Sequence, residues 1–132
     1  MSTPSFKTGP ITYDVAEDVS KFRLVEVTAE GVKHATAAGP VHGAIAENGY
    51  ADPEDHPGID TVKAARVAVR MSPETTPVEV SGDATAIEQG APLYAAADGK
   101  VSATGTVLVG FATRPGYRGR VSVTLLTPVF PA

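Results

Sequence analysis

The segment from Thr106 to Thr127 reads TVLVGFATRPGYRGRVSVTLLT, and it decides the fold class. Residues 106–113 and 120–127 are Val-rich and of strand length, and the second segment alternates between apolar and polar positions as far as Leu125. Alternation with a period of two is typical of a strand with one buried face. The connection 114–119 contains Pro and Gly, which favour turns. The segment therefore predicts two β-strands joined by a short connection.

Similar segments recur along the rest of the chain. Of the 132 residues, 17 are Val, 14 are Thr and only 5 are Leu, while 13 Gly and 11 Pro disfavour helices. We therefore expect a mainly β protein, a small β-barrel or sandwich-like domain. A chain of this length supports one core, so residues 11–127 are predicted to form a single domain. The expected strands are 11–15, 22–28, 32–36, 41–46, 61–70, 78–80, 93–96, 101–103, 106–113 and 120–127, and Pro73 and Pro77 are expected to bracket a turn.

Both ends and one internal segment lack this alternation. Residues 1–10 are rich in Pro and small polar residues and are predicted to form a flexible arm, and residues 128–132 a short, unstructured tail. The apolar side chains on these ends, Phe6, Val129 and Phe130, either anchor the chain to a partner or fold back on its body, and the sequence leaves both open. Residues 47–60 hold two Pro, two Gly and five carboxylates and are expected to form a long surface loop.

One part of the chain resembles another. Leu24–Val27, an acidic-Gly turn and Val41–Ala44 match Leu93–Ala96, a similar turn and Leu108–Phe111, and each copy is followed by a Gly/Pro loop and a Val-rich strand. A repeated β-unit that closes on itself is one way to build a small barrel without exposed edges. Chance similarity among short Ala-, Val- and Gly-rich strands explains the match equally well.

Charge and composition narrow the classes of partner. Fifteen acidic and eleven basic residues give a formal net charge of −4, so nucleic acid is not expected as a partner. The absence of Cys excludes disulfides, thiolate zinc sites and thiol nucleophiles. No apolar run approaches the roughly 18 residues of a membrane helix, and the N-terminus lacks the apolar stretch of a signal peptide. We therefore expect a soluble, unsecreted protein with no membrane partner.

Residues that commonly carry catalysis or bind metals are few. His34, His42 and His56 match no metal-ligand spacing, and the first two lie on expected strands and are interpreted as structural. The acidic loop 47–60 can in principle collect a hard cation, but it lacks the ligand register of a calcium loop, which favours a solvated loop. The chain has neither a Gly-x-Ser-x-Gly turn nor a phosphate-binding loop. We expect no enzyme, no metal and no cofactor.

The connection between the last two expected strands is rich in basic residues. Residues 114–120 include three Arg and one Tyr. Arg and Tyr are enriched at interfaces, so this segment either binds an acidic protein surface or is a solvated hairpin tip.

A series of segments in fixed order runs through the chain: Gly9–Ser20, Leu24–Val27, Val41–Ala46, Gly90–Val101, Val109–Ala112 and Gly119–Leu125. In this order they resemble the small capsid decoration, or cement, proteins of tailed bacteriophages. The sequence departs from that family at Lys21-Phe22, where Gly is common, and in the longer loop from Glu47 to Asp60. The resemblance implies a β-barrel-like homotrimer on the outer surface of the expanded capsid, assembled in the host cytoplasm. There it would bridge subunits of the major capsid protein and stabilise the head.

This interpretation assigns contacts but no catalytic, cofactor or metal residues. The candidate contacts with the capsid or between subunits of the trimer are Phe6, Lys7, Arg114, Tyr117, Arg118, Val129 and Phe130. The first alternative is a small β-barrel ligand-binding or carrier module, suggested by Lys100 beside the turn Asp98-Gly99. An enzyme whose site assembles from scattered acids is the second alternative.

Overall fold

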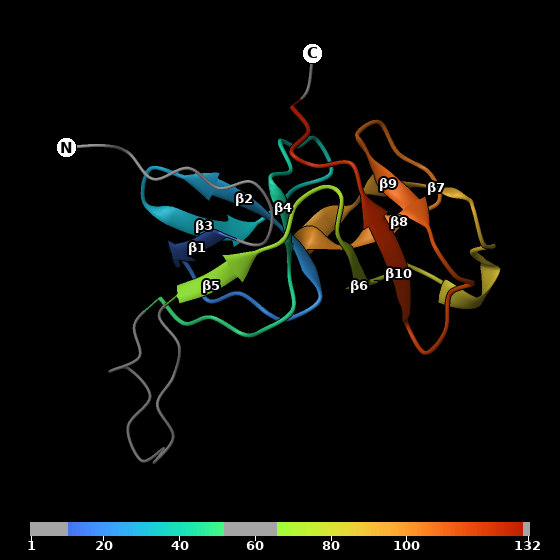
Figure 1. Ribbon diagram of the computed structural model, residues 1–132, viewed down its shortest axis with the longest axis horizontal. Coiled ribbons are helices and arrows are strands. Elements are labelled where there is room, and N and C mark those ends of the chain that lie inside the picture. Colours follow the sequence, from blue (N-terminus) through green and yellow to red (C-terminus); the bar gives the residue numbers. More distant parts are fainter. Residues whose placement is uncertain (1–10, 52–65, 131–132) are drawn as a thin grey trace.

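The computed structural model describes residues 11–51 and 66–130 and is almost entirely β (Figure 1). The mainly β prediction is confirmed, and every segment expected to be a strand overlaps an observed one, although 78–80 covers only the last two residues of its strand. In the last strand, Val121, Val123 and Leu125 are buried and alternate with more exposed residues, as the sequence pattern requires. The strands are β1 Ile11–Asp14, β2 Arg23–Thr28, β3 Gly31–His34, β4 Gly43–Ile45, β5 Arg66–Val69, β6 Thr75–Glu79, β7 Pro92–Ala95, β8 Val101–Ser102, β9 Leu108–Ala112 and β10 Arg120–Leu125, with short 3-10 turns η2 Ala84–Ala86 and η3 Ala97–Gly99.

The strands form two halves with the same pairing order (Figure 1). In the first half, β1 to β5, the order is β1-β5-β4-β2-β3, where Ala44 of β4 and Arg70 after β5 exchange backbone hydrogen bonds of 2.9 and 2.8 Å. In the second half, β6 to β10, the order is β6-β10-β9-β7-β8. One five-stranded arrangement is thus built twice, and the internal sequence match reflects a structural repeat.

The first and last strands of each row also touch. Val15, directly after β1, forms a parallel bridge with Val32 of β3, and Val80, directly after β6, forms one with Val101 of β8. In both cases the next amide along the chain donates to the partner's carbonyl oxygen, at 2.9 and 2.8 Å. These bridges occupy part of the strand edges that would otherwise be open to another chain.

A glycine stands at the same place in each half because the neighbouring strand passes too close for a side chain. A Cβ on Gly43 would meet the backbone carbonyl of Arg70, and one on Gly110 would meet that of Thr124. A valine methyl of the neighbouring strand would lie within 2.8 Å in the first half and 2.9 Å in the second. The sequence match placed these two Gly in register, and this part of it is confirmed.

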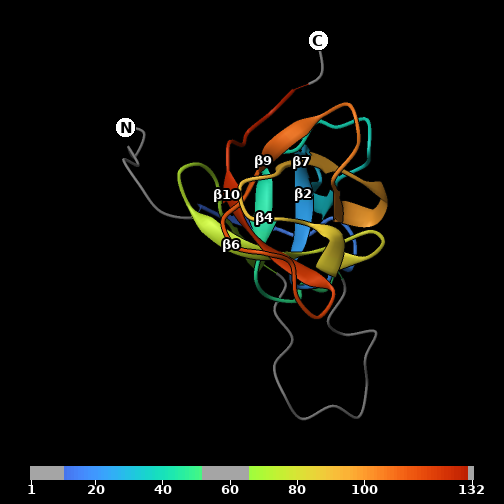
Figure 2. The same cartoon turned by 90° about the vertical axis from the view of Figure 1, so that its right-hand side faces the viewer.

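Two cores fill the molecule, and one of them joins the halves. The first lies inside the first half and includes Val25 and Val67. The second fills the second half and also takes in Leu24 and Val41 from the first half. Neighbouring residues of β2 therefore belong to different cores, as period-two alternation directs. Figure 2, viewed from the side of the second half, shows β2 and β4 behind the strands of that half.

Two expectations about Pro77 and the chain end are wrong. Pro77 does not mark a turn but lies inside β6, opposite Ser122 of β10. It is tolerated because β6 is the outermost strand of its sheet, where a missing N–H costs no ladder bond on the open side. Residues 128–130 are not unstructured: Val129 and Val41 exchange backbone hydrogen bonds of 2.9 and 2.7 Å, so this apolar residue folds back on the body.

Several expectations lie outside the described residues. These are the arm 1–10 with Phe6 and Lys7, most of the loop 47–60 with His56, and the first part of the expected strand 61–70. The division into an arm, one domain over 11–127 and a tail stays a prediction.

Candidate interaction surface

The connection between β9 and β10 ends in a tight hairpin turn. The amide of Tyr117 donates to the carbonyl of Arg120 at 2.8 Å, and the amide of Arg120 donates back at 3.2 Å. The two residues between them, Arg118 and Gly119, have φ of 54° and 77°. Positive φ at both central positions is the requirement of a type I′ turn, which matches the twist of the flanking strands. The turn holds Tyr117 and Arg118 out in solvent on a well-defined backbone.

The turn η2 and the residue after it, Ile87, pack against the connection at Gly116. Gly116 is buried there, its amide donates to the carbonyl of Ile87 at 3.1 Å, and a Cβ on it would collide with the carbonyl of Ala84. Asp83 caps η2 and accepts hydrogen bonds from the Thr85 hydroxyl at 2.6 Å and from the Thr85 amide at 3.0 Å, and these two bonds, the hydroxyl first, hold the pKa of the Asp83 carboxyl below its usual value. The base of the connection is therefore fixed, and its tip is exposed.

Positive charge and aromatic rings meet around this turn. The guanidinium of Arg118 lies 5.1 Å from the centre of the Tyr117 ring, and that of Arg120 lies 4.3 Å from the centre of the Phe22 ring. Lys21 Nζ lies 5.4 Å from the same Phe22 ring. Such distances are those of cation–π contacts. We call these five residues, Lys21, Phe22, Tyr117, Arg118 and Arg120, the cationic surface.

An open hollow adjoins the cationic surface. It has a volume of about 210 Å³ and is lined by Pro77, Pro115, Tyr117, Arg120, Val121 and Ser122. Two Pro rings and a Tyr ring give it apolar walls, and one guanidinium gives it a charged edge. Tyr117 is 66% exposed, so a partner would bury much aromatic surface here.

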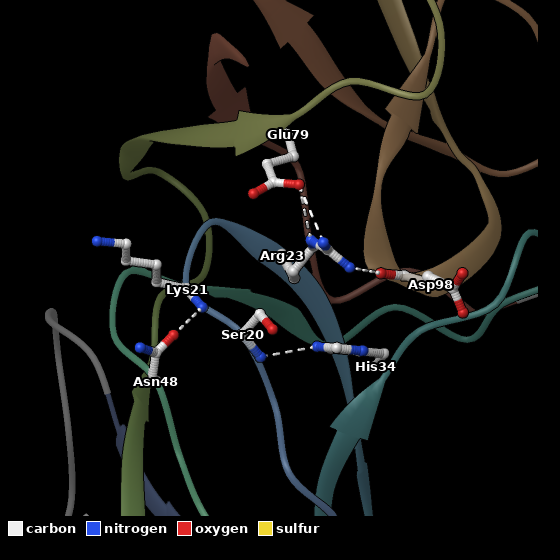
Figure 3. Close-up of polar contacts among 7 residues, drawn as sticks. All are labelled: Ser20, Lys21, Arg23, His34, Asn48, Glu79 and Asp98. Carbon is white, nitrogen blue, oxygen red and sulfur yellow. Dashed lines mark hydrogen bonds and ion pairs between the residues drawn. The ribbon is translucent and has the colours of Figure 1, made fainter. Parts of the chain in front are cut away.

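The junction between the halves carries a second group of polar residues (Figure 3). Arg23 of β2 reaches across to the second half, where its guanidinium lies 3.0 Å from the Glu79 carboxylate and donates to the carbonyl of Asp98 at 2.9 Å. Nε2 of His34 accepts a hydrogen bond of 2.9 Å from the amide of Ser20. Burial, and then the nearby Arg23, lower the pKa of His34, which keeps its imidazole neutral and able to accept this bond.

Both described histidines have structural partners. His42 Nδ1 accepts from the amide of Val27 at 3.0 Å, and its ring packs edge-on against Phe130 at 5.2 Å. The interpretation of His34 and His42 as hydrogen-bonded structural residues is confirmed. Two further hollows, of about 210 and 250 Å³, lie beside Glu47 and beside His34.

In residues 11–51 and 66–130, no three His, Asp or Glu side chains gather as metal ligands would. None of the helical segments in the described part of the chain is long and apolar enough to cross a bilayer.

The structure brings some of the expected contact residues together and separates others. Tyr117 and Arg118 stand on one turn, and Arg114 is exposed at the start of the same connection. Val129 and Phe130 follow the other end of β10, where Phe130 is 61% exposed on His42. The sequence did not predict Phe22 as a contact residue. It lies in the loop before β2 and joins the cationic surface only because the chain folds.

Comparison with protein-family models and with curated proteins gives no match. Among solved structures, the chain is similar to the crystal structure of the N base of head fiber gp8.5 of bacteriophage phi29. The alignment covers 96% of this chain and 99% of that one, with a TM-score of 0.61 and 16% sequence identity. The two chains share a fold. The shared part extends over nearly the whole length of both, so it includes both halves and not one β-unit alone.

Proposed function

We propose that the chain is a structural protein of a tailed-phage head. In this proposal it is a decoration, or cement, protein of the virion that binds the outer surface of the expanded capsid and bridges subunits of the major capsid protein. The observation that carries the proposal is the fold match to a head fiber base over 96% of this chain and 99% of that one. The order of segments that resembles phage decoration proteins supports it independently.

The construction of the molecule suits a protein that acts by adhesion. Each half has its own bridged row of strands, and a shared core locks the halves together. The exposed features include a rigid Arg- and Tyr-bearing turn, the aromatic side chain of Phe130 near the C-terminus and the apolar side chains of Leu108, Phe111 and Leu126, all of which suit contacts with a partner. We therefore propose that the protein has no catalytic activity of its own.

Assembly as a homotrimer belongs to the same proposal. Three copies that each make modest contacts attach firmly, because the second and third contacts form at high effective concentration. We propose that residues 1–10 act as an arm, 11–127 as the body and 128–132 as the tail. Phe6, Lys7, Arg114, Tyr117, Arg118 and Phe130 are proposed contacts, and Val129 contributes through its pairing with Val41.

The carrier alternative finds no support in the structure. A carrier lysine needs the exposed tip of a hairpin, but here η3 forms the tip and packs against the first half. The amide of Gly99 donates to the carbonyl of Ala35 at 2.8 Å, and a Cβ on Gly99 would collide with the carbonyl of Leu24. Lys100 follows the buried Gly99 and is itself only partly exposed.

The test uses heads of the phage that encodes the chain. Purified virions should contain the polypeptide, and heads prepared without it should bind the full-length protein when expanded and bind it far less before expansion. Light scattering of the free protein should give the mass of a trimer. Absence from virions, or equal binding to both head forms, contradicts the proposal.

A further inference from the structure

The two halves offer a comparison within one molecule. At the same register position, each half sets an acid of its first strand opposite an Arg of its last: Asp14 faces Arg66, and Glu79 faces Arg120. In the first half the two form an ion pair, with Arg66 Nε 2.9 Å from Asp14 Oδ1. In the second half, Arg23 of the first half takes the carboxylate of Glu79 instead, at 3.0 Å. Because Glu79 pairs with Arg23 at the junction between the halves, Arg120 forms no ion pair with the acid opposite it.

Arg120 lies over the ring of Phe22 instead of over a carboxylate. Phe22 is held at both backbone groups, since its amide donates to Ile45 and its carbonyl accepts from Glu79, each at 2.8 Å. Its φ is 62°, in the left-handed region that a bulky residue rarely adopts. A strained conformation held in place by its surroundings points to a functional constraint. Here it keeps an aromatic ring under the Arg120 guanidinium, which has no hydrogen-bond or ion-pair partner among the described residues.

Three unpaired cations, Lys21, Arg118 and Arg120, meet at the cationic surface. Among the residues that the structure describes, the ion pairs use Arg23, Arg66 and Arg70. Lys21, Arg114, Arg118 and Arg120 have no carboxylate within ion-pair distance in those same ranges. Lys33 of β3 and Lys100 after η3 also lack a carboxylate partner, so three of the six unpaired cations among the described residues belong to the cationic surface.

We infer that the cationic surface is the docking site for an acidic segment of a partner protein, which in the proposed function is the capsid shell. A guanidinium backed by an aromatic ring presents a planar fork of donors that matches a carboxylate. The adjoining hollow, with Pro77, Pro115 and the Tyr117 ring, receives an apolar side chain of the same segment. The net negative charge of the chain disfavours nucleic acid as the occupant.

The first experiment measures binding of the full-length protein to expanded heads. Arg120→Gln and the double variant Arg118→Gln/Arg120→Gln should weaken binding by about tenfold or more and reduce its dependence on salt. Arg66→Gln is the matched control, because Arg66 holds the equivalent position and is already paired with Asp14. It should bind within about twofold of the wild type, and the thermal melting of all variants shows that they fold. Equal binding by the wild type and the folded double variant overturns the docking site.

The second experiment keeps the docking site testable if wild-type protein fails to bind heads, a result that would overturn the proposed function alone. Amide NMR spectra of the full chain are recorded with added poly-L-glutamate and, separately, with duplex DNA. Poly-L-glutamate should shift the resonances of residues 21–22 and 117–120 in the wild type and not in the double variant. Shifts elsewhere, no shifts, or larger shifts with DNA would refute an acidic protein segment as the occupant.

Discussion

Because the core of the second half also takes in residues of the first half, we expect the two halves to unfold as one unit. Substitution of Leu24 tests this expectation. Its side chain is fully buried and comes from β2 of the first half, but it packs in the core of the second half. Leu24→Ala removes three carbon groups, worth about 2.4 kcal/mol of transfer free energy at ~0.8 kcal/mol each. The cavity that remains raises the loss to about 3–4 kcal/mol. At about 4 °C per kcal/mol, the melting temperature should fall by about 12–16 °C.

The assay combines calorimetry with amide hydrogen exchange of β10. A single transition at lower temperature, with exchange in β10 roughly 140- to 700-fold faster, is the expected result. Val25→Ala is the matched variant, because Val25 is the next residue of β2 and is equally buried, but lies in the core of the first half. It should also accelerate exchange in β10, by a smaller factor. If either variant melts in two transitions, or leaves the protection of β10 unchanged, the halves are independent and the reasoning fails.

Three further predictions concern the repeat, the junction and pH. Gly110→Ala forces a methyl group against the neighbouring strand and should cost at least about 1–3 kcal/mol of unfolding free energy in urea titrations. Arg23→Gln should lower the free energy of unfolding by about 1–2 kcal/mol. It should also free Glu79 to pair with Arg120, so binding to heads should weaken even though Arg23 lies outside the cationic surface. Unchanged binding would contradict this exchange of partners. Burial lowers the pKa of His34 in the folded chain, so below the ordinary His pKa of about 6.5 the unfolded chain binds more protons than the folded one. The stability that depends on neutral His34 should therefore be complete above that pH and decline below it. His34→Gln should flatten this decline in denaturation curves at pH 7.5 and 5.5, and an unaltered decline would assign it to other groups.

Local patterns predicted most of the strands and one of the turns. The alternation in residues 120–125 gave β10, and the Gly after Arg118 allowed the hairpin turn. The internal match was also informative, because a Gly that a neighbouring strand forces on the chain is visible in the sequence at Gly43 and Gly110. The internal match was wrong by one residue in β2, because the strand pairing places Val25, and not Leu24, at the position that corresponds to Leu93. A register shift between Leu93 and Tyr94 of β7 breaks the simple alignment there.

What the sequence could not predict depends on contacts between distant segments. Arg23 and Glu79 are 56 positions apart, and only the packing of one half on the other decides that they pair. Because that pairing releases Arg120, the composition of the cationic surface follows from the junction and not from residues 114–120 alone. The backbone of Phe22 is a similar case, since no local signal marks a bulky residue for positive φ.

The repeat also bears on how the molecule can attach to a larger assembly. Addition of a strand to a sheet edge requires a row of free N–H and C=O groups. Here the outer strands of each half are short and already bridged to each other, at Val15–Val32 and Val80–Val101. The described body therefore has little strand edge for such pairing, and in the proposed function its contacts come from side chains on turns and from the chain ends. The duplicated fold supplies the same register position twice. In the first half Asp14 and Arg66 pair with each other, and in the second half Arg120 lies over Phe22 and, in the proposed docking, binds a carboxylate of the partner.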